Sequence, residues 1–201
     1  MGYYIFSYGI NTAEIKEAIG SKDNDLFEDI LETEIFDNYS DQNFPGHTTT
    51  REALEHLIFG HAYDARSAHA YWYAFIALCA HLGQDLPSTH EIKLGYETDL
   101  INGYMASDFG IKVVIEEVLI NERNEWGLPV VQDWPLSGLL DRNQLTKLQS
   151  LFAPIEITDE KLEQLQEEDD EKEMAYDSIR QTKENIDYCI YNNLDLISFC
   201  H

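Results

Sequence analysis

The chain has 201 residues, of which 38 are Asp or Glu and 13 are Lys or Arg, so its formal net charge at pH 7 is -25. Charge of this sign repels phosphate backbones and anionic lipid, which disfavours direct binding to nucleic acid or to a membrane surface. Hydrophobic residues make up 44% of the chain and aromatic residues 12%, which is too apolar for a disordered acidic tail and predicts a folded protein.

The length of the chain predicts a single compact domain over 1–201, because no linker rich in Pro, Gly or Ser separates two parts of the sequence. We see no basic and apolar signal-peptide regions, and the longest apolar stretch, 70–80, is shorter than the ~20 residues that span a bilayer. Cys79, Cys189 and Cys200 are an odd number without a CxxC pair, which favours reduced thiols over disulfides or a zinc site. We therefore expect a cytoplasmic protein, whose oligomeric state the sequence leaves open.

The first fifty residues predict one strand and two helices. β-forming side chains over 3–8 predict the strand, and Asn11 predicts the capped start of a short helix over 12–19. Apolar residues at helical spacing predict an amphipathic helix over 26–35. The segment 37–47 is expected to be a loop.

Residues 67–82, SAHAYWYAFIALCAHL, are apolar on nearly every side of a helix. A helix without a polar face must be surrounded by protein, so we expect this segment to be the central core helix. A shorter helix is expected before it, starting at a capping box formed by Thr49 and Glu52.

After the core helix, Ser88 with Glu91 predicts another helix start, which opens a helical region that Gly95 and Gly103 interrupt. Residues 111–120 fit either a strand or a helix, because β-branched side chains and helical spacing occur together. We favour the helix.

The last third begins with an ordered loop over 126–135, because its prolines push the preceding residues into extended geometry. Asp141 with Gln144 predicts a capped helix, and a long helical segment is expected from Thr158 or Asp159. Residues 194–201 alternate in part and predict a final strand that could pair with the first one. Together these elements predict an α+β fold, mostly α, with helices packed around the core helix and a small sheet from the N- and C-terminal strands.

The motifs of common enzymes and metal sites do not occur in the sequence. Its glycines are too far apart for a P-loop or a dinucleotide fingerprint, and a GxSxG motif is missing. Six of the seven histidines lie between positions 47 and 90, but none has the spacing of HExxH or of a Cys-His zinc finger. We therefore assign no catalytic residue, no metal ligand and no cofactor.

A mixed group of titratable and aromatic residues precedes and enters the core helix: His61, Asp64, Arg66, His69 and Trp72. Such residues at the entrance to a helix could line a ligand pocket. They could instead form a buried polar network that caps and orients the helix, which is the interpretation we favour.

Two further groups could contact a partner. The first is Trp126, Asp133 and Trp134, because Trp is enriched at interface hot spots, although anchoring in the core explains them equally well. The second is an acidic run, which consists of Glu167, Glu168, Asp169, Asp170 and Glu171. On one helix, five consecutive side chains point all round the axis, so the run does not imitate a nucleic-acid groove and is typical of a solvated segment.

Several segments resemble a family of uncharacterised bacterial proteins that share a domain of unknown function. In that family a helix of the type YGYALELLCEHLG precedes a proline, and a loop of the type GxPxPxPxxxxxPxxG follows. Here Tyr71–Ala74 and Leu78–Gly83 match the helix, and the opening GYYIFSYGI and the ending DLISFCH contribute to the resemblance. The loop lacks the family's other prolines and retains Gly127, Pro129, Pro135 and Gly138. The resemblance implies a bacterial cytosolic origin and one compact domain, and it assigns no activity.

Three functions follow from this reasoning. We expect first a non-enzymatic interaction protein, immunity- or inhibitor-like, that binds a basic protein partner, because opposite charge speeds such encounters and selects the partner. The alternative is a small-molecule-binding protein or enzyme with a pocket around His61, His69 and Trp72. The weaker alternative is a nucleic-acid mimic, which would need a one-sided acidic stripe.

Overall fold

The computed structural model describes residues 2–40 and 45–201. The elements are β1 (Tyr4–Ile10), α1 (Thr12–Ala18), α2 (Asn24–Leu31), α3 (Glu34–Ser40), α4 (Thr50–Phe59), η1 (Ala65–Ser67), α5 (Ala68–Leu82), β2 (Ile92–Lys93), α6 (Tyr96–Asp108), α7 (Ile115–Leu119), β3 (Leu136–Leu140), α8 (Arg142–Phe152), α9 (Asp159–Glu168), α10 (Asp170–Tyr191) and β4 (Asp195–Cys200). The fold is 57% helical with a small antiparallel sheet, which confirms the predicted α+β, mostly α class. No helix in the described ranges is both long and apolar enough to cross a membrane.

The chain folds into two compact units. Unit 1 comprises residues 1–9, 85–123 and 137–201, and unit 2 comprises residues 10–84 and 124–136. Because each unit is assembled from separate stretches of chain, no single linker marks the division. The single domain expected over the whole chain stays a prediction.

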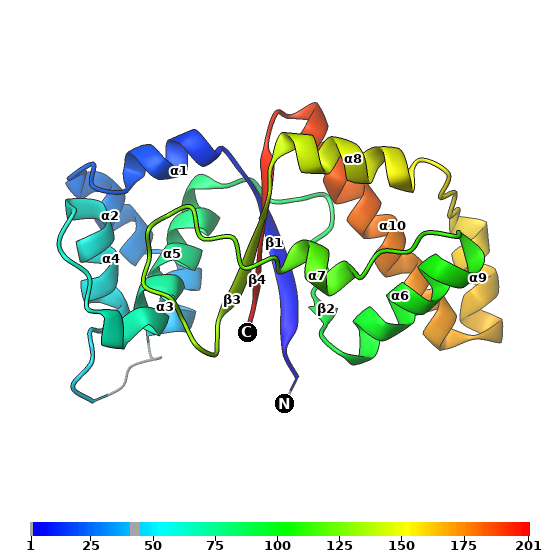
Figure 1. Ribbon diagram of the computed structural model, residues 1–201, viewed down its shortest axis with the longest axis horizontal. Helices are drawn as coiled ribbons and strands as arrows, with labels where there is room; N and C mark the ends of the chain where they lie inside the picture. The colour runs from blue at the N-terminus through cyan, green and yellow to red at the C-terminus, as the bar shows by residue number, and fades with distance from the viewer. Residues whose placement is uncertain (1, 41–44) are drawn as a thin grey trace. The chain divides into compact units, whose positions relative to one another are not determined.

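Unit 1 is built on a sheet whose strands run in the order β2-β1-β4-β3 (Figure 1). β1 pairs antiparallel with β2, with Tyr4 opposite Lys93 and Ile5 opposite Ile92. On its other side, the N–H of Tyr4 donates to the carbonyl of His201 at 3.2 Å, and the N–H of His201 donates back at 3.3 Å. The expected pairing of the terminal strands is therefore confirmed.

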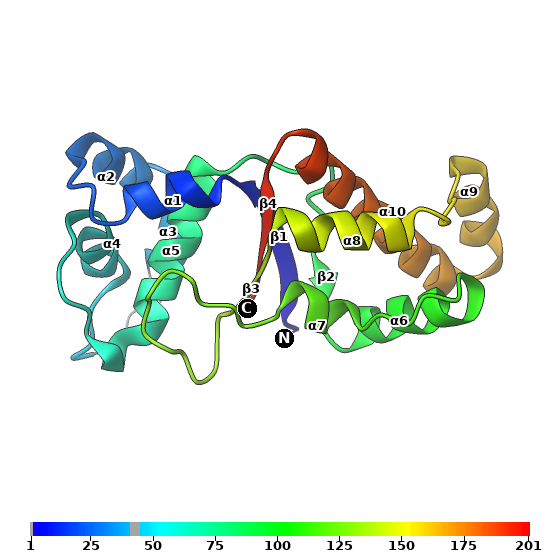
Figure 2. The same cartoon turned by 45° about the horizontal axis from the view of Figure 1, so that its top comes forward.

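The long helix α10 packs against α6, α8 and α9 within unit 1 (Figure 2). Its buried residues recur at helical spacing and include Ala175, Ile179, Thr182, Ile186 and Cys189. A stripe of this kind faces a core while the opposite face stays in water. α10 thus forms one wall of the unit. Polar residues beside its buried stripe can form hydrogen bonds with the neighbouring loop, as Asn185 does.

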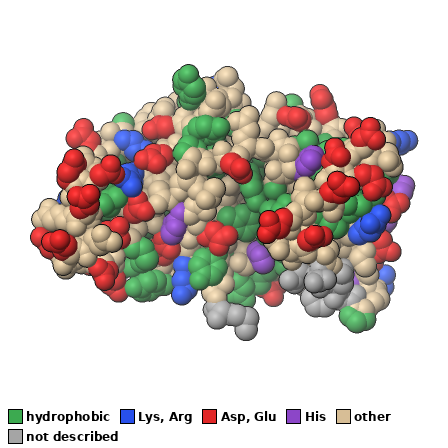
Figure 3. All heavy atoms as spheres, turned by 180° about the vertical axis from the view of Figure 1, so that it is seen from behind, with side chains coloured by type: hydrophobic (Ala, Val, Ile, Leu, Met, Phe, Trp, Pro, Cys, Tyr) green, Lys and Arg blue, Asp and Glu red, His purple; other side chains and the backbone are tan. Residues whose placement is uncertain are grey.

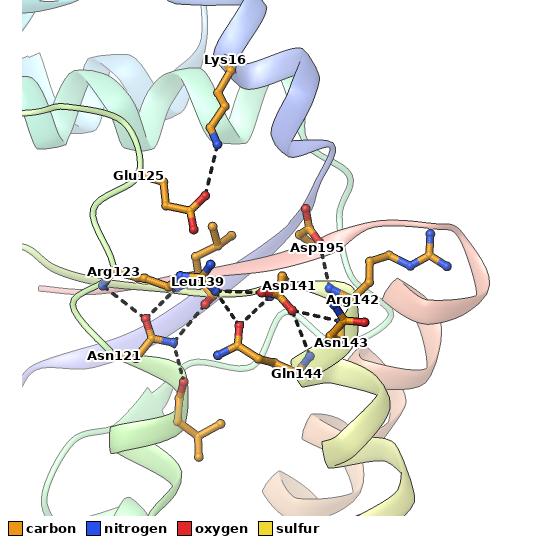
Figure 4. Close-up of polar contacts among 11 residues, drawn as sticks. Lys16, Asn121, Arg123, Glu125, Leu139, Asp141, Arg142, Asn143, Gln144 and Asp195 are labelled. Atoms are coloured by element: carbon orange, nitrogen blue, oxygen red, sulfur yellow. Dashed lines mark hydrogen bonds and ion pairs between the residues drawn. The ribbon is translucent and has the colours of Figure 1, made fainter.

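The outer edge of β3 is covered by the chain that follows α7. The Asn121 side chain donates from Nδ2 to the carbonyl of Leu139 at 3.0 Å and accepts the N–H of the same residue at 3.2 Å (Figure 4). It therefore satisfies an edge that would otherwise expose unpaired backbone groups. The approach is so close that a Cβ at Gly138 would lie 2.0 Å from the carbonyl oxygen of Leu119.

The predicted capping box of α8 is confirmed. The N–H of Gln144 donates to Oδ1 of Asp141 at 3.0 Å, and the N–H of Asp141 donates to Oε1 of Gln144 at 3.0 Å. Arg123 adds a hydrogen bond from Nη1 to each of these side chains, at 3.0 Å and 2.7 Å (Figure 4). The box therefore also joins β3 and α8 to the segment that covers the sheet edge.

Unit 2 consists of α1 to α5, η1 and the segment 124–136. α5 packs against α1, α2, α3 and α4, and all its side chains from Ala70 to Cys79 are at most 8% exposed. The capping box before α4 forms as expected, since Thr49 and Glu52 exchange backbone-to-side-chain bonds of 2.8 Å and 3.2 Å. Local capping and an apolar helix therefore account for much of this unit.

The loop expected over 37–47 begins later than predicted, because α3 continues to Ser40. Phe36 and Tyr39 are buried, and they give this short helix an inward face among its acidic and amide residues. Residues 41–44 of that prediction lie outside the described part of the chain.

The helix start predicted at Ser88 and Glu91 is wrong. Asn185 of α10 holds the Ser88 backbone, accepting its N–H and donating to its carbonyl, both at 3.1 Å. The chain then enters β2, and α6 begins only after Gly95, which has a left-handed φ of 87°. Gly103 lies inside α6 and does not interrupt it. A contact with a residue 97 positions away therefore overrides the local capping signal.

Two more predictions need correction. Within 111–120, only α7 is helical, and its first N–H, that of Ile115, is bound by the Asn102 side chain at 2.8 Å. The long helix expected from Thr158 is divided into α9 and α10 at Asp169, whose φ of -161° and ψ of 89° are not helical.

Candidate functional site

Two groups of residues that the sequence analysis treated separately meet at one cavity of unit 2. The cavity has a volume of about 540 Å³ and lies between the start of α5 and the segment 130–134. Its lining includes the predicted residues Arg66, His69, Asp133 and Trp134. Tyr73, one turn further along α5, completes the aromatic part of the wall.

Asp64 organises the entrance to α5. Its side chain accepts the backbone N–H of Arg66 at 3.1 Å and binds the guanidinium through two bonds, of 3.1 Å to Nε and 3.0 Å to Nη2. These contacts with Arg66 lower the pKa of the Asp64 carboxyl to about 2. The Ser67 hydroxyl donates to the same carboxylate and accepts the N–H of Thr48, so the preceding loop is tied to the helix start.

The two titratable side chains of α5 at this cavity are shifted toward their neutral forms. Burial lowers the pKa of His69, and the nearby His47 ring, 5.7 Å away between centroids, lowers it further. Burial raises the pKa of Tyr73, with a further contribution from Asp133. In these neutral forms the His69 and Tyr73 side chains can stack on a ligand and form hydrogen bonds with it.

The other predicted residues of these groups lie outside the cavity lining. Trp72 is 3% exposed, and its Nε1–H donates to the carbonyl of Pro129 at 2.9 Å. Trp126 is 6% exposed and packs on Phe75, with 4.8 Å between ring centroids. His61 is exposed and lies beside another histidine ring of unit 2. Trp72 and Trp126 therefore anchor the loop to the core.

The acidic run lies at the junction of α9 and α10. Glu167 and Glu168 end α9, and Asp170 and Glu171 begin α10. Between them, Asp169 accepts the N–H of Lys172 at 3.1 Å and caps α10. All five side chains of the run are exposed. The run therefore crosses a break between two helices instead of winding round one.

Two bases of this region, Lys172 and Arg180, pair with acids outside the run. Lys172 Nζ lies 2.6 Å from Oδ2 of Asp108, and its bond to Asp108 raises the pKa of the Lys172 ammonium. Arg180 pairs with Asp159 at 2.6 Å and with Asp177 at 2.8 Å. We call the exposed acids Glu163, Glu167, Glu168, Asp169, Asp170 and Glu171 the acidic junction. The acids that bind Lys172 and Arg180 in these ion pairs are not members of the acidic junction.

Sequence reasoning missed a polar cluster in unit 1. Glu97, in the first turn of α6, is 4% exposed and is the one charged residue that is fully buried in the described ranges. Its Oε1 accepts from Nε2 of His90 at 2.8 Å and from Oγ of Ser178 at 2.5 Å, and its Oε2 accepts the N–H of Lys93 at 3.0 Å. No local pattern pointed to this cluster, because its members lie on a loop, a strand and two helices.

The protonation states of this cluster follow from the contacts. Burial raises the pKa of Glu97, but the bonds from His90, Ser178 and Lys93 together outweigh it, and the pKa lies below its usual value. The bond to Glu97 raises the pKa of His90. Ser178 and His90 both donate to the carboxylate, so the arrangement differs from a triad in which histidine accepts the serine proton.

Metal binding has no support from the described geometry. No group of three or more His, Cys, Asp or Glu residues in the ranges 2–40 and 45–201 is placed to hold a metal ion.

Comparison with known proteins gives the family but no functional relative. No curated protein and no solved structure matches the chain. A family model described as a domain of unknown function (DUF7691) matches residues 1–201. The chain therefore belongs to this family.

Proposed function

We propose that the protein binds a basic protein partner through the acidic junction and catalyses no reaction, in the manner of an immunity protein or an inhibitor. The observation that carries this proposal is the position of five consecutive exposed acids at a break between helices, while the neighbouring bases Lys172 and Arg180 are paired with other carboxylates. The junction is thus a concentrated negative charge in unit 1.

The C-terminal end of α9 adds to this charge, while the positive N-terminal end of α10 favours Asp170 and Glu171. Glu167 and Glu168 lie in the last turn of α9, where the helix dipole is itself negative and an acid is unfavourable. A Lys or Arg side chain from a partner would interact with these carboxylates and with the end of the helix. The net charge of -25 would also steer a cationic protein toward the surface and raise the association rate.

Acidic side chains also keep a protein soluble, so the test must separate position from total charge. On the face shown in Figure 3, Asp and Glu side chains are dispersed and do not form one stripe. We therefore compare two variants with equal changes of charge.

The junction variant carries Glu163→Gln, Glu167→Gln, Glu168→Gln and Asp170→Asn. The control variant carries Glu28→Gln, Asp29→Asn, Glu32→Gln and Glu34→Gln, which are exposed acids of unit 2. Both sets leave the Asp169 cap in place and remove four negative charges.

The probe is a fluorescein-labelled peptide of ten lysines, and its binding is measured by fluorescence anisotropy at low and high NaCl. We expect the junction variant to bind about tenfold more weakly than the wild type, and the control variant to bind within about threefold. Binding by the wild type should weaken as salt rises. Equal losses in the two variants, or no loss in either, would refute the proposed site.

We further propose that the protein is bacterial and acts in the cytoplasm. The three cysteines are buried and free, which suits a reducing compartment, and the family resemblance supports the origin. A thiol count on the protein isolated from its native cells under alkylating conditions tests the location, and any disulfide found there would contradict it.

A second candidate function rests on the cavity of unit 2, because Arg66, His69, Asp133 and Trp134 come from distant parts of the chain to line it. The probes are the amino acids and the common nucleotides, tested by thermal shift. A ligand of this cavity should raise the melting temperature of the wild type. His69→Ala should abolish the shift while the unliganded protein stays folded, whereas loss of the fold would assign His69 a structural role.

A further inference from the structure

Unit 1 contains a cavity of about 370 Å³ that the proposals above do not use. It lies between α10 and the segment 155–158, which joins α8 to α9. The α10 residues of its lining are Arg180, Lys183, Glu184 and Asp187. They are spaced as i, i+3, i+4 and i+7, so they share one face of the helix. An apolar protein cavity of ~150 Å³ holds benzene, so this one has room for an organic molecule of about ten non-hydrogen atoms.

Both bases of the lining extend from α10 toward the opposite wall. Lys183 donates from Nζ to the carbonyl of Ile155 at 2.9 Å. Arg180 donates from Nη1 to Oδ1 of Asp159, directly after the segment, at 2.6 Å. The two bases are three positions apart, which is about 4.5 Å along the helix axis. Because the chain has only 13 bases against 38 acids, two cations at one cavity depart from the charge of the protein as a whole.

These bases keep hydrogen-bond donors that the described part of the chain does not use. The Lys183 ammonium has three donors, and among the described residues it makes one hydrogen bond, to Ile155, and no ion pair with a carboxylate. Nε of Arg180 is buried and has no hydrogen-bond acceptor in the described ranges. Oε1 of Glu184 is 4.0 Å from it, which is beyond hydrogen-bond distance. Because a buried donor without an acceptor is costly, the bases favour a ligand that supplies oxygen acceptors.

Acids line the same cavity: Glu156, Glu184 and Asp187. Glu156 is exposed, and the side chain of Glu184 is 52% exposed. Asp187 is held in place by Gln149 of α8, whose Nε2 donates to its Oδ1 at 2.8 Å. A ligand with a carboxylate alone would be repelled by these acids, and a ligand with an ammonium alone would be repelled by the two bases. The lining therefore suits a ligand that carries both charges.

We propose that this cavity binds a small zwitterion of the chemical class of the α-amino acids. The ligand carboxylate would accept charge-assisted hydrogen bonds from Nζ of Lys183. The ligand ammonium would pair with Glu184, whose half-exposed side chain can turn toward it. That turn would leave the Nε–H of Arg180 to donate to the ligand carboxylate. The lining shares no residue with the acidic junction or with the cavity of unit 2, so the site stands independently of both proposed functions.

The test is an NMR titration of the backbone amide signals at neutral pH with L-leucine, L-leucinamide and isocaproate. These probes share a hydrocarbon part and carry both charges, the positive charge alone and the negative charge alone. We expect saturable binding of leucine to the wild type, and about tenfold weaker binding of the other two. Lys183→Met should weaken leucine about tenfold. The matched control Lys147→Met changes an exposed lysine of α8 outside the lining and should bind leucine within about twofold of the wild type.

Glu184→Gln gives a second test, whose direction depends on the ligand. It should weaken leucine about tenfold, and it should leave isocaproate unchanged or bound more tightly, because it removes a negative charge from the lining. Circular dichroism establishes that the variants are folded, and Glu184→Gln alone tests the site if Lys183→Met does not fold. Absence of saturable leucine binding, equal affinity for the three probes, equal losses in Lys183→Met and Lys147→Met, or unchanged leucine binding in Glu184→Gln would each overturn the proposal.

Discussion

Glu97→Gln is expected to destabilise unit 1 although it preserves the size of the side chain. The two carboxylate oxygens of Glu97 accept from His90, Ser178 and the N–H of Lys93. A glutamine has one oxygen acceptor, so its amide nitrogen must face at least one of these donors. The substitution therefore leaves a donor without its acceptor and removes the counter-charge of a protonated His90.

The size of this effect follows from burial. Removing one partner of a buried ion pair costs about 3–5 kcal/mol. The His90 side chain is 41% exposed while that of Glu97 is 5% exposed, so water can compensate His90 in part and the lower end, about 3 kcal/mol, applies. For a protein of this size, that loss lowers the melting temperature by about 6–12 °C.

The dependence on pH separates the two partners. Since the pKa of Glu97 is lowered from 4.5, its contribution is present above about pH 4.5 and is lost as pH falls through the folded-state pKa. Since the pKa of His90 is raised from 6.5, its contribution is complete below about pH 6.5 and is lost as pH rises through the folded-state pKa. The pair should therefore stabilise most between these two values.

Urea unfolding followed by circular dichroism measures both effects. Wild type, Glu97→Gln and His90→Gln are compared between about pH 5 and pH 9. The cost of His90→Gln should be largest at the acidic end of this range and shrink at the alkaline end. A Glu97→Gln protein within about 1 kcal/mol of the wild type, or a cost of His90→Gln that grows with pH, would refute this account of the cluster.

Three further predictions concern the scaffold. Gly138→Ala should cost more than about 3 kcal/mol or prevent folding, since its Cβ would lie 2.0 Å from the Leu119 carbonyl oxygen; Gly103→Ala, with nothing within 4 Å, is the control and should be neutral or stabilising in the same urea assay. Thr49→Ala should cost about 1 kcal/mol by removing the cap of α4, and an unchanged urea midpoint would contradict this. The buried free cysteines, of which Cys189 has its pKa raised by burial to about 12, should react with a thiol reagent only after denaturation; reaction in the native protein would show that they are accessible.

Local signals in the sequence predicted the elements whose contacts are local. Thr49 with Glu52 and Asp141 with Gln144 form the expected capping boxes, because each box depends on residues three positions apart. The apolar segment of α5 is buried as expected, since a helix without a polar face needs protein on all sides. These features needed no information about distant residues.

The wrong predictions concern positions that distant residues determine. Ser88 has the form of a cap, but Asn185 captures its backbone groups, and this contact follows only from the path of the whole chain. Neither β2, which has two residues, nor β3 was predicted as a strand. Strands this short take their stability from their neighbours in the sheet. The Glu97 cluster was also missed, since its partner Ser178 lies 81 positions away. Arg66 and His69 were named in one group and Asp133 and Trp134 in another, and the meeting of these four residues at one cavity was not predicted.

The position of β4 between β1 and β3 has a consequence for synthesis. β4 is the last element along the chain, so β1 and β3 have no partner between them until residues 195–200 have been translated. By contrast, α1 to α5 of unit 2 are complete once residue 82 has been made. We therefore expect the nascent chain to form the helices of unit 2 early, while β1 and β3 wait for their shared neighbour until residues 195–200 have emerged from the ribosome.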